Sequence, residues 1–231
     1  MKNPFSEFSG KDSETSVRRL PMQDILEAHS HVLDVLKSGF KRLVEDEAGD
    51  GLWQPDGDSI ERVYEKAITI VAGFSFESGD VEAFAVSSFR SEDPDFFLMG
   101  PLGLYVSSLC NASESSQMSL SFQGQDLRLP LLGYRLGEGR LLSVDGHLGD
   151  LAGISMLGGT LRVSGHVGRY LGAGMVAGRI EVGGDAGRFV GEQMTGGEVR
   201  VSGRLGGVGK PSGGVVYHRR QCVYGDPETV S

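Results

Sequence analysis

Glycine recurs every 19 residues in the second half of the chain. One glycine column holds Gly146, Gly165, Gly184 and Gly203, and three further columns start at Gly149, Gly153 and Gly159. Methionine keeps the same spacing at Met156, Met175 and Met194. A short fixed period of this kind is typical of a solenoid, in which each repeat is one structural unit stacked on the next.

Each repeat contains one segment of alternating residues, such as GGTLRVSG and AGRIEVGG. Side chains two apart in a strand point the same way, so Leu161 and Val163 share a face that Arg162 does not. The aliphatic columns are Leu142, Leu161, Ile180 and Val199; and Val144, Val163, Val182 and Val201. The pattern predicts a mainly β protein with a right-handed parallel β-helix of 19-residue coils. Five or six coils would make a rod roughly 25 Å long.

Stacking in this register would place opposite charges side by side. Arg162, Glu181 and Arg200 fall in one column, and Arg179 and Glu198 fall in another. A third apolar column holds Leu151, Tyr170, Phe189 and Val208. We expect the glycines at the corners, where a turning chain often needs a positive φ.

The first half of the chain has a helical pattern. Apolar residues recur at three- and four-residue steps from about Leu20 to Glu47, at Ile25, Val32, Leu36, Phe40 and Leu43. A second helix is expected after Ser59, which could cap it. The segments 80–89 and 102–112 are short, and we assign both to helices. The resulting division is an acidic, mainly helical region over 1–118, the β-helix over 119–217 and a tail over 218–231.

Solenoids need atypical end units, because an open last coil leaves backbone groups unpaired. The helical region could cover one end of the rod. The charged residues His218, Arg219 and Arg220 could blunt the other end.

Charge divides the chain in the same way as the pattern does. Residues 1–80 carry a net charge of −7, residues 81–139 carry −4, and residues 140–231 carry +2. An acidic chain without a basic stripe is a poor nucleic-acid binder. No apolar run is long enough to span a membrane and no secretion signal is visible. Cys110 and Cys222 lack metal-site spacing and are expected to be reduced thiols of a cytoplasmic protein.

Several groups could carry chemistry, and each has a simpler interpretation. His147, His166 and Asp185 share a column with Arg204 and could bind a metal ion, although surface turn residues are favoured. The methionine column could be a soft-metal site, but a buried sulfur stack is favoured. The sequence from Gly172 to Ala177 matches a dinucleotide-binding fingerprint, yet a strand is expected after it where a helix is required.

Two further groups of this kind lie in the first half of the chain. His29 and His31 lie two apart on a helix, so they do not face the same way and do not suit a metal pair. The acidic run of Glu45, Asp46 and Glu47, together with Asp50, could bind a cation but is interpreted as a solvated helix end.

The repeats over residues 119–217 resemble the GXGXG repeat family. The resemblance rests on the glycine, methionine and valine columns of GGTLRVSGHVGRYLGAGMVAGRIEVGGDAGRFVGEQMTGGEVRVSG. This family includes the C subunit of formylmethanofuran dehydrogenase, a related formyltransferase/hydrolase complex, and the C-terminal domain of the glutamate synthase large subunit. The resemblance implies a right-handed β-helix that braces neighbouring catalytic subunits. It implies no catalytic, cofactor-binding or metal-binding residues in the repeats.

The function expected from these observations is a non-catalytic scaffold subunit of a multi-subunit oxidoreductase, most similar to the C subunit of formylmethanofuran dehydrogenase. The alternatives are an accessory subunit of a glutamate-synthase-like amidotransferase and an independent enzyme that uses the N-terminal region. The expected partners are catalytic protein subunits, and a homo-oligomer is left open.

Overall fold

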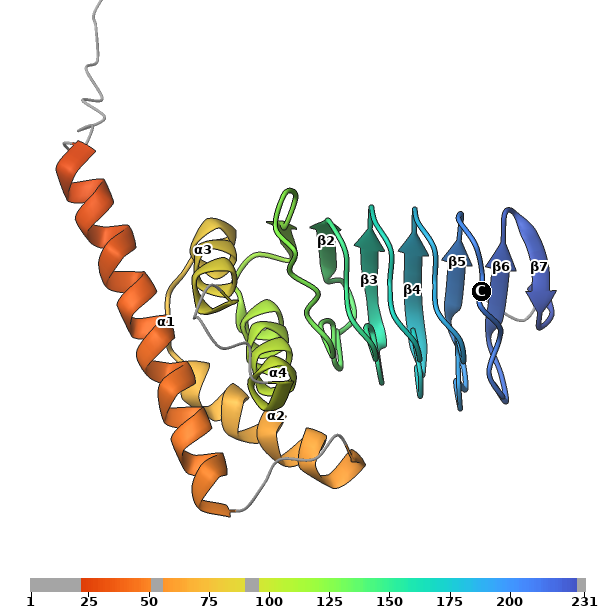
Figure 1. The fold of residues 1–231 in the computed structure, drawn as a ribbon, viewed down its shortest axis with the longest axis horizontal. Coiled ribbons are helices and arrows are strands. Elements are labelled where there is room, and N and C mark those ends of the chain that lie inside the picture. Colours follow the sequence, from red (N-terminus) through yellow and green to blue (C-terminus); the bar gives the residue numbers. More distant parts are fainter. Residues whose placement is uncertain (1–21, 51–55, 90–95, 228–231) are drawn as a thin grey trace, which may run out of the picture.

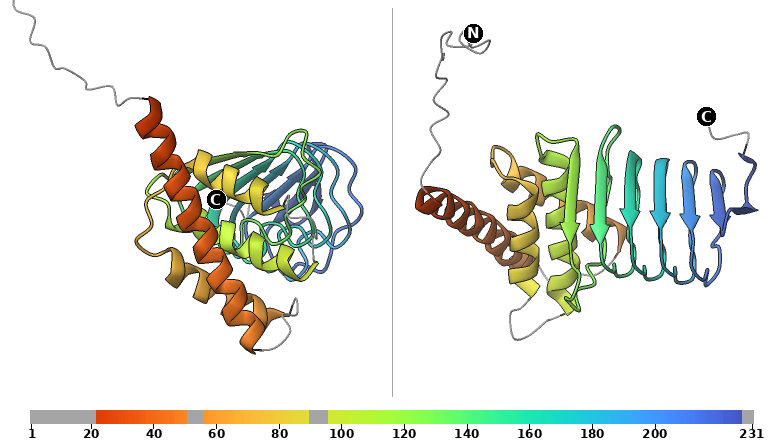
Figure 2. Two further views of the ribbon diagram at one scale, coloured as in Figure 1. Left: turned by 60° about the vertical axis from the view of Figure 1, so that its left-hand side comes forward. Right: turned by 90° about the horizontal axis from the view of Figure 1, so that it is seen from above.

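The computed structural model describes residues 22–50, 56–89 and 96–227. Within these ranges, helices come first in the chain, and a sheet of seven strands in sequence order follows. The helices gather at one end of a rod formed by the strands (Figure 1). Seen from the helical end, the coils lie behind the helices as one stack (Figure 2, left).

The helical assignments over the first half are confirmed. The helices are α1 (Met22–Asp50), α2 (Gly57–Val71), α3 (Ser78–Phe89) and α4 (Phe96–Ala112). On α1, Leu36 and Leu43 are fully buried, as the spacing predicts. The cap of α2 differs from the prediction, because Asp56 caps this helix. Its Oδ1 accepts a hydrogen bond from the Ser59 backbone N–H at 2.8 Å, and Ser59 lies inside the first turn.

The strands confirm the predicted β-helix. They are β1 (Gln117–Ser121), β2 (Leu141–Asp145), β3 (Leu157–Val163), β4 (Ala177–Val182), β5 (Glu198–Val201), β6 (Val215–His218) and β7 (Gln221–Tyr224). Strands β1 to β6 pair in parallel, each with the next. Val163 pairs with Val144 on one side and with Val182 on the other, so equivalent residues stack directly.

The stacked apolar columns fill the interior of the rod. The valines of β2 to β5 are at most 3% exposed, and the column that contains Leu161 is fully buried. A second, shorter row of parallel bridges joins Leu148, Val167, Ala186 and Leu205. Met156, Met175 and Met194 are also fully buried, which agrees with a sulfur stack inside the core.

Only some of the glycine columns follow the expected rule of a positive φ. Gly172 has a φ of +65°, and its column turns the chain as predicted. Gly184 has no such φ, but a Cβ there would lie 2.5 Å from the carbonyl oxygen of Gly165 on the preceding coil. In this column glycine is needed because consecutive backbones approach closely.

Helix α4 covers the first coil. The buried Ser107 Oγ donates to the Gly103 or Leu131 carbonyl and accepts from the Gly133 N–H at 3.0 Å. From the coil side, Arg140 donates to three carbonyls at the end of α4 and just after it. The helical region therefore caps one end of the rod, as predicted.

The other end closes with a hairpin. Strand β7 lies inside the segment predicted to be a tail and pairs antiparallel with β6. Arg219 and Arg220 form the turn, with φ values of +49° and +69°. Because the chain turns back here, the last strand of the sheet is antiparallel and not another coil.

Candidate functional site

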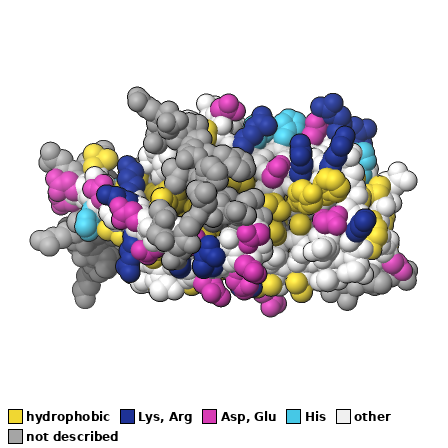
Figure 3. Space-filling model, turned by 60° about the horizontal axis from the view of Figure 1, so that its bottom comes forward, with side chains coloured by type: hydrophobic (Ala, Val, Ile, Leu, Met, Phe, Trp, Pro, Cys, Tyr) yellow, Lys and Arg dark blue, Asp and Glu magenta, His cyan; other side chains and the backbone are white. Residues whose placement is uncertain are grey.

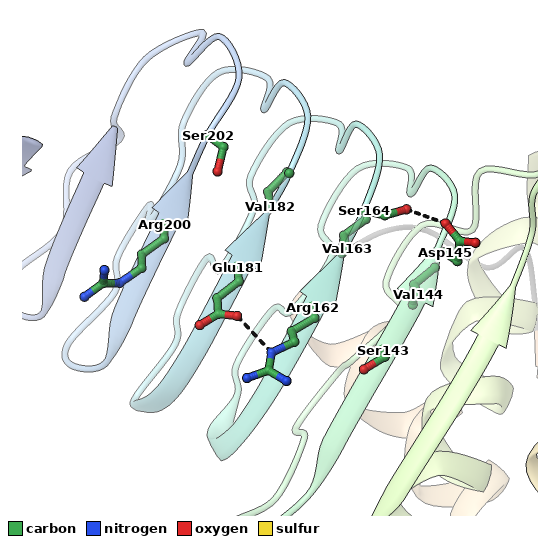
Figure 4. A pocket seen from close by; sticks show the side chains of 11 residues that line it. Ser143, Val144, Asp145, Arg162, Val163, Ser164, Glu181, Val182, Arg200 and Ser202 are labelled. Carbon is green, nitrogen blue, oxygen red and sulfur yellow. Dashed lines mark hydrogen bonds and ion pairs between the residues drawn. The ribbon is translucent and has the colours of Figure 1, made fainter. Parts of the chain in front are cut away.

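A shallow groove of about 530 Å³ runs along the outward face of strands β2 to β5 (Figure 4). Its lining combines outward-facing polar and charged side chains with the valines of β2 to β4, which are at most 3% exposed: Ser143, Val144, Asp145, Arg162, Val163, Ser164, Glu181, Val182, Gly183, Arg200 and Ser202. These side chains come from consecutive coils, so the groove is a row of equivalent positions. Such a row can form hydrogen bonds and ion pairs along its length.

The charges in this groove are paired within the chain. Arg162 Nε lies 2.8 Å from Glu181 Oε2 on the next coil, as the register predicts. Arg200, the next residue in that column, pairs with Glu198 instead and lies over the Tyr217 ring at 4.6 Å from its centroid. At the end of the groove, Ser164 Oγ donates to Asp145 Oδ1 at 2.7 Å. These bonds fix the orientation of the side chains.

The histidine column forms a stacked row of turn residues. The rings of His147 and His166 lie 4.9 Å apart and nearly parallel. The Nδ1 of each ring accepts a backbone N–H from the next coil, at His166 and Asp185. Asp185 continues the pattern with the Arg204 N–H, and this hydrogen bond lowers the pKa of the Asp185 carboxyl. The side chains of this row therefore act as hydrogen-bond acceptors for backbone N–H groups at the corner of the next coil.

The fold accounts for the other groups that were candidates for metal, thiol or dinucleotide chemistry. In the part of the chain that the structure describes, no group of three or more His, Cys, Asp or Glu side chains could hold a metal ion. Cys110 is buried with its Sγ 3.2 Å from Met118 Sδ, and burial raises the pKa of this thiol to about 12. A strand, β4, begins at Ala177, where a dinucleotide fingerprint would need a helix.

One corner of the rod exposes aromatic rings beside arginines. Tyr170 and Phe189 occupy equivalent positions on consecutive coils, and their rings stack at 4.8 Å. Arg169 and Arg188 precede them and are exposed. We call these four residues the corner ridge. On the face drawn in Figure 3, Lys and Arg side chains lie next to hydrophobic ones on the β-helical half.

The corner ridge was not singled out from the sequence, where its aromatic residues fall in an apolar column. The column is not interior, since Phe189 is 41% exposed. A signal was available in the sequence: two aromatic residues replace the aliphatic type at two adjacent repeats, and each follows an arginine.

In the helical region, two predicted positions have specific partners. His29 Nδ1 lies 2.7 Å from Asp80 Oδ1, and this hydrogen bond raises the pKa of His29. Glu47 was expected at a solvated helix end but is only 4% exposed and pairs with Arg62 and Lys66 of α2. That expectation was wrong for Glu47, because α2 packs over the end of α1.

In comparisons with known proteins, no family model, curated protein or solved structure matches this chain. Among the described helices, none combines the length and the apolar character that crossing a bilayer requires.

Proposed function

We propose that this protein is a non-catalytic scaffold subunit of a multi-subunit oxidoreductase, of the kind to which the C subunit of formylmethanofuran dehydrogenase belongs. One observation carries the proposal: outward-facing side chains of the rod are bonded to their equivalents one coil away. The Arg162–Glu181 pair and the Asp185–Arg204 pair are examples. Rows held in this way present fixed groups at a regular spacing.

The surface also carries apolar side chains that suit a protein partner. Leu157 and Val176, one coil apart, are 51% and 52% exposed. Single exposed aliphatic residues are ordinary, but two at neighbouring positions of consecutive coils, where Leu157 pairs with Ala177, form an apolar surface that suits a protein partner. Extended solenoid faces are used for binding in this manner.

An accessory subunit of a glutamate-synthase-like amidotransferase is the second candidate, since the same repeat resemblance favours it. An independent enzyme that uses the N-terminal region has less support. Several charged groups among the described residues of that region join helices to one another, as His29 joins Asp80 and Glu47 joins Arg62. Residues engaged in this way stabilise the packing of α1, α2 and α3.

Purification of the tagged full chain from its native host would test the scaffold proposal. We expect a catalytic oxidoreductase partner to co-purify in a constant ratio through size-exclusion chromatography, carrying molybdenum, tungsten or flavin. A co-purifying amidotransferase would favour the second candidate. A double variant, Leu157→Ser with Val176→Ser, keeps the core intact and should lower the yield of partner. A chain that elutes alone and turns over substrate by itself would overturn the proposal.

A further inference from the structure

The turns that follow strands β2, β3 and β4 are each joined to the next coil by a side chain. The Nδ1 atoms of His147 and His166 accept the backbone N–H groups of His166 and Asp185, at 2.9 and 2.8 Å. At the next equivalent position, Asp185 Oδ1 accepts the Arg204 N–H at 2.7 Å. We call these three hydrogen bonds the corner links. Two of them depend on an imidazole and the third on a carboxylate.

The corner links determine where each imidazole holds its proton. A ring nitrogen that accepts an N–H carries no proton, so the neutral rings of His147 and His166 are protonated on Nε2. A positively charged imidazole has an N–H on both nitrogens and accepts no hydrogen bond. Proton uptake therefore replaces the acceptor with a donor that faces the N–H of the next coil. The link at Asp185 differs, because a carboxylate remains an acceptor down to about pH 4.

The two rings are also close enough to repel each other once they are charged. Their centroids lie 4.9 Å apart, and the ring planes differ by 4°. Two stacked imidazolium ions would be like charges on neighbouring strands, which is destabilising. The side chain of His166 is 53% exposed, so protons from the solvent reach this ring in the folded chain.

The charges around the row do not favour a proton on the rings. The nearest carboxylate oxygen is Asp185 Oδ2, which lies 3.8 Å from His166 Nδ1 but pairs with the Arg204 guanidinium at 2.8 Å. The other charged residues of these turns and of the preceding coil are Asp126, Arg128, Asp145, Asp150, Arg169 and Arg188. Together with the Asp185–Arg204 pair, they comprise as many arginines as aspartates.

We propose that the stacked pair of His147 and His166 is an acid-sensitive link between consecutive coils of the rod. Histidines of the unfolded chain take up protons around pH 6.5, whereas uptake in the folded chain breaks a corner link. The unfolded state then binds more protons, so the stability that the pair contributes is present at neutral pH. It is lost as the pH falls toward about 5. The inference does not depend on the scaffold function, because it concerns only this chain.

Thermal melting of the full chain and of the double variant His147→Asn with His166→Asn tests the proposal. Asparagine offers an amide oxygen where Asp185 offers a carboxylate oxygen, so the acceptor is kept and the titration is removed. Between about pH 7.5 and about pH 5, the melting temperature of the unchanged protein should fall by about 2–4 °C more than that of the double variant. His29 and the other titrating groups are common to both proteins, so their contributions cancel.

A matched control removes a histidine from another part of the chain. His31 is exposed on α1, and His31→Asn should leave the pH dependence of the melting temperature unchanged. Equal pH dependence of the unchanged protein and the His147/His166 double variant would overturn the proposal.

Hydrogen exchange of single amides, followed by NMR on the unchanged protein, locates the effect. After correction for the intrinsic exchange rate, protection of the His166 and Asp185 amides should fall about tenfold between about pH 7.5 and about pH 5. The Arg204 amide has a carboxylate acceptor and should keep its protection. Constant protection at His166 and Asp185 would contradict the proposal, and so would an equal loss at Arg204, which would show that the whole rod opens in acid. These amide measurements decide the question even if the double variant does not fold.

Discussion

At the scale of single residues, the rod depends on two requirements that repeat every coil. Interior positions must be apolar, because each is enclosed by its equivalents above and below, as Val182 is by Val163 and Val201. Some corner positions must lack a side chain, because the neighbouring backbone occupies the space. Both requirements come from direct stacking and can be tested one residue at a time.

Replacing Val182 with Asp should destabilise the protein by at least about 3 kcal/mol, because it buries an unpaired charge inside the ladder. Denaturant unfolding followed by circular dichroism would measure the loss. Glu181→Gln, on the adjacent outward-facing position, should change the free energy of unfolding by less than about 1 kcal/mol. Equal effects at the two positions would mean that Val182 is not interior.

Replacing Gly184 with Ala should cost about 1–3 kcal/mol, since the new Cβ would overlap the Gly165 carbonyl and force the coils apart. The matched change is Gly79→Ala in α3, where no atom lies within 4 Å of the added Cβ. That variant should be neutral or slightly stabilised, because alanine favours the helix. Thermal melting of both would be compared, and a neutral Gly184→Ala would contradict the close-approach explanation.

At the scale of elements, the helices are joined by a few buried polar contacts between apolar faces. Asp80 is 5% exposed and accepts hydrogen bonds from both His29 and the Glu77 N–H. It therefore connects α1 to the start of α3. Glu47 connects the end of α1 to α2 in a similar way. These contacts fix how the cap sits on the rod.

The His29–Asp80 contact should make stability depend on pH. The hydrogen bond to Asp80 raises the pKa of His29 in the folded state. The contact's contribution to the free energy of unfolding is therefore fully present below the pKa of histidine in the unfolded chain, about 6.5. It is lost as the pH rises through the pKa of His29 in the folded protein. We expect the melting temperature to exceed that of His29→Gln by more at about pH 5.5 than at about pH 8.5. A difference that is constant or grows with pH would contradict this coupling.

At the scale of the whole molecule, the two halves depend on each other. The first coil buries Leu131, Leu132 and Tyr134 beneath the helices, and Ser107 of α4 bonds to that coil. A rod without its cap would expose these side chains together with unpaired backbone groups. The helical region is thus part of the folding unit.

Removing residues 1–115 should consequently give a chain that self-associates or unfolds. Light scattering coupled to size-exclusion chromatography would detect association, and melting would detect lost stability. A monomeric fragment with the melting temperature of the full chain would show that the rod is stable without the helices.

The period of the sequence determined the parallel β-helix, its register and its interior columns. Stacking one coil on the next repeats the same local environment every 19 residues, so Val144, Val163 and Val182 were identifiable as equivalent. The helical character of the first half could be predicted from its apolar spacing for the same reason, since both signals are local.

Only the tertiary structure decided which residues meet across the chain. The burial of Glu47 depends on how α2 packs against α1, and the exposure of Phe189 depends on the direction in which a left-handed corner residue points. The final strand β7 turns back because Arg219 and Arg220 adopt a turn. Such features arise where the repeat ends or where two elements meet, and the spacing of residues along the chain carries no information about them.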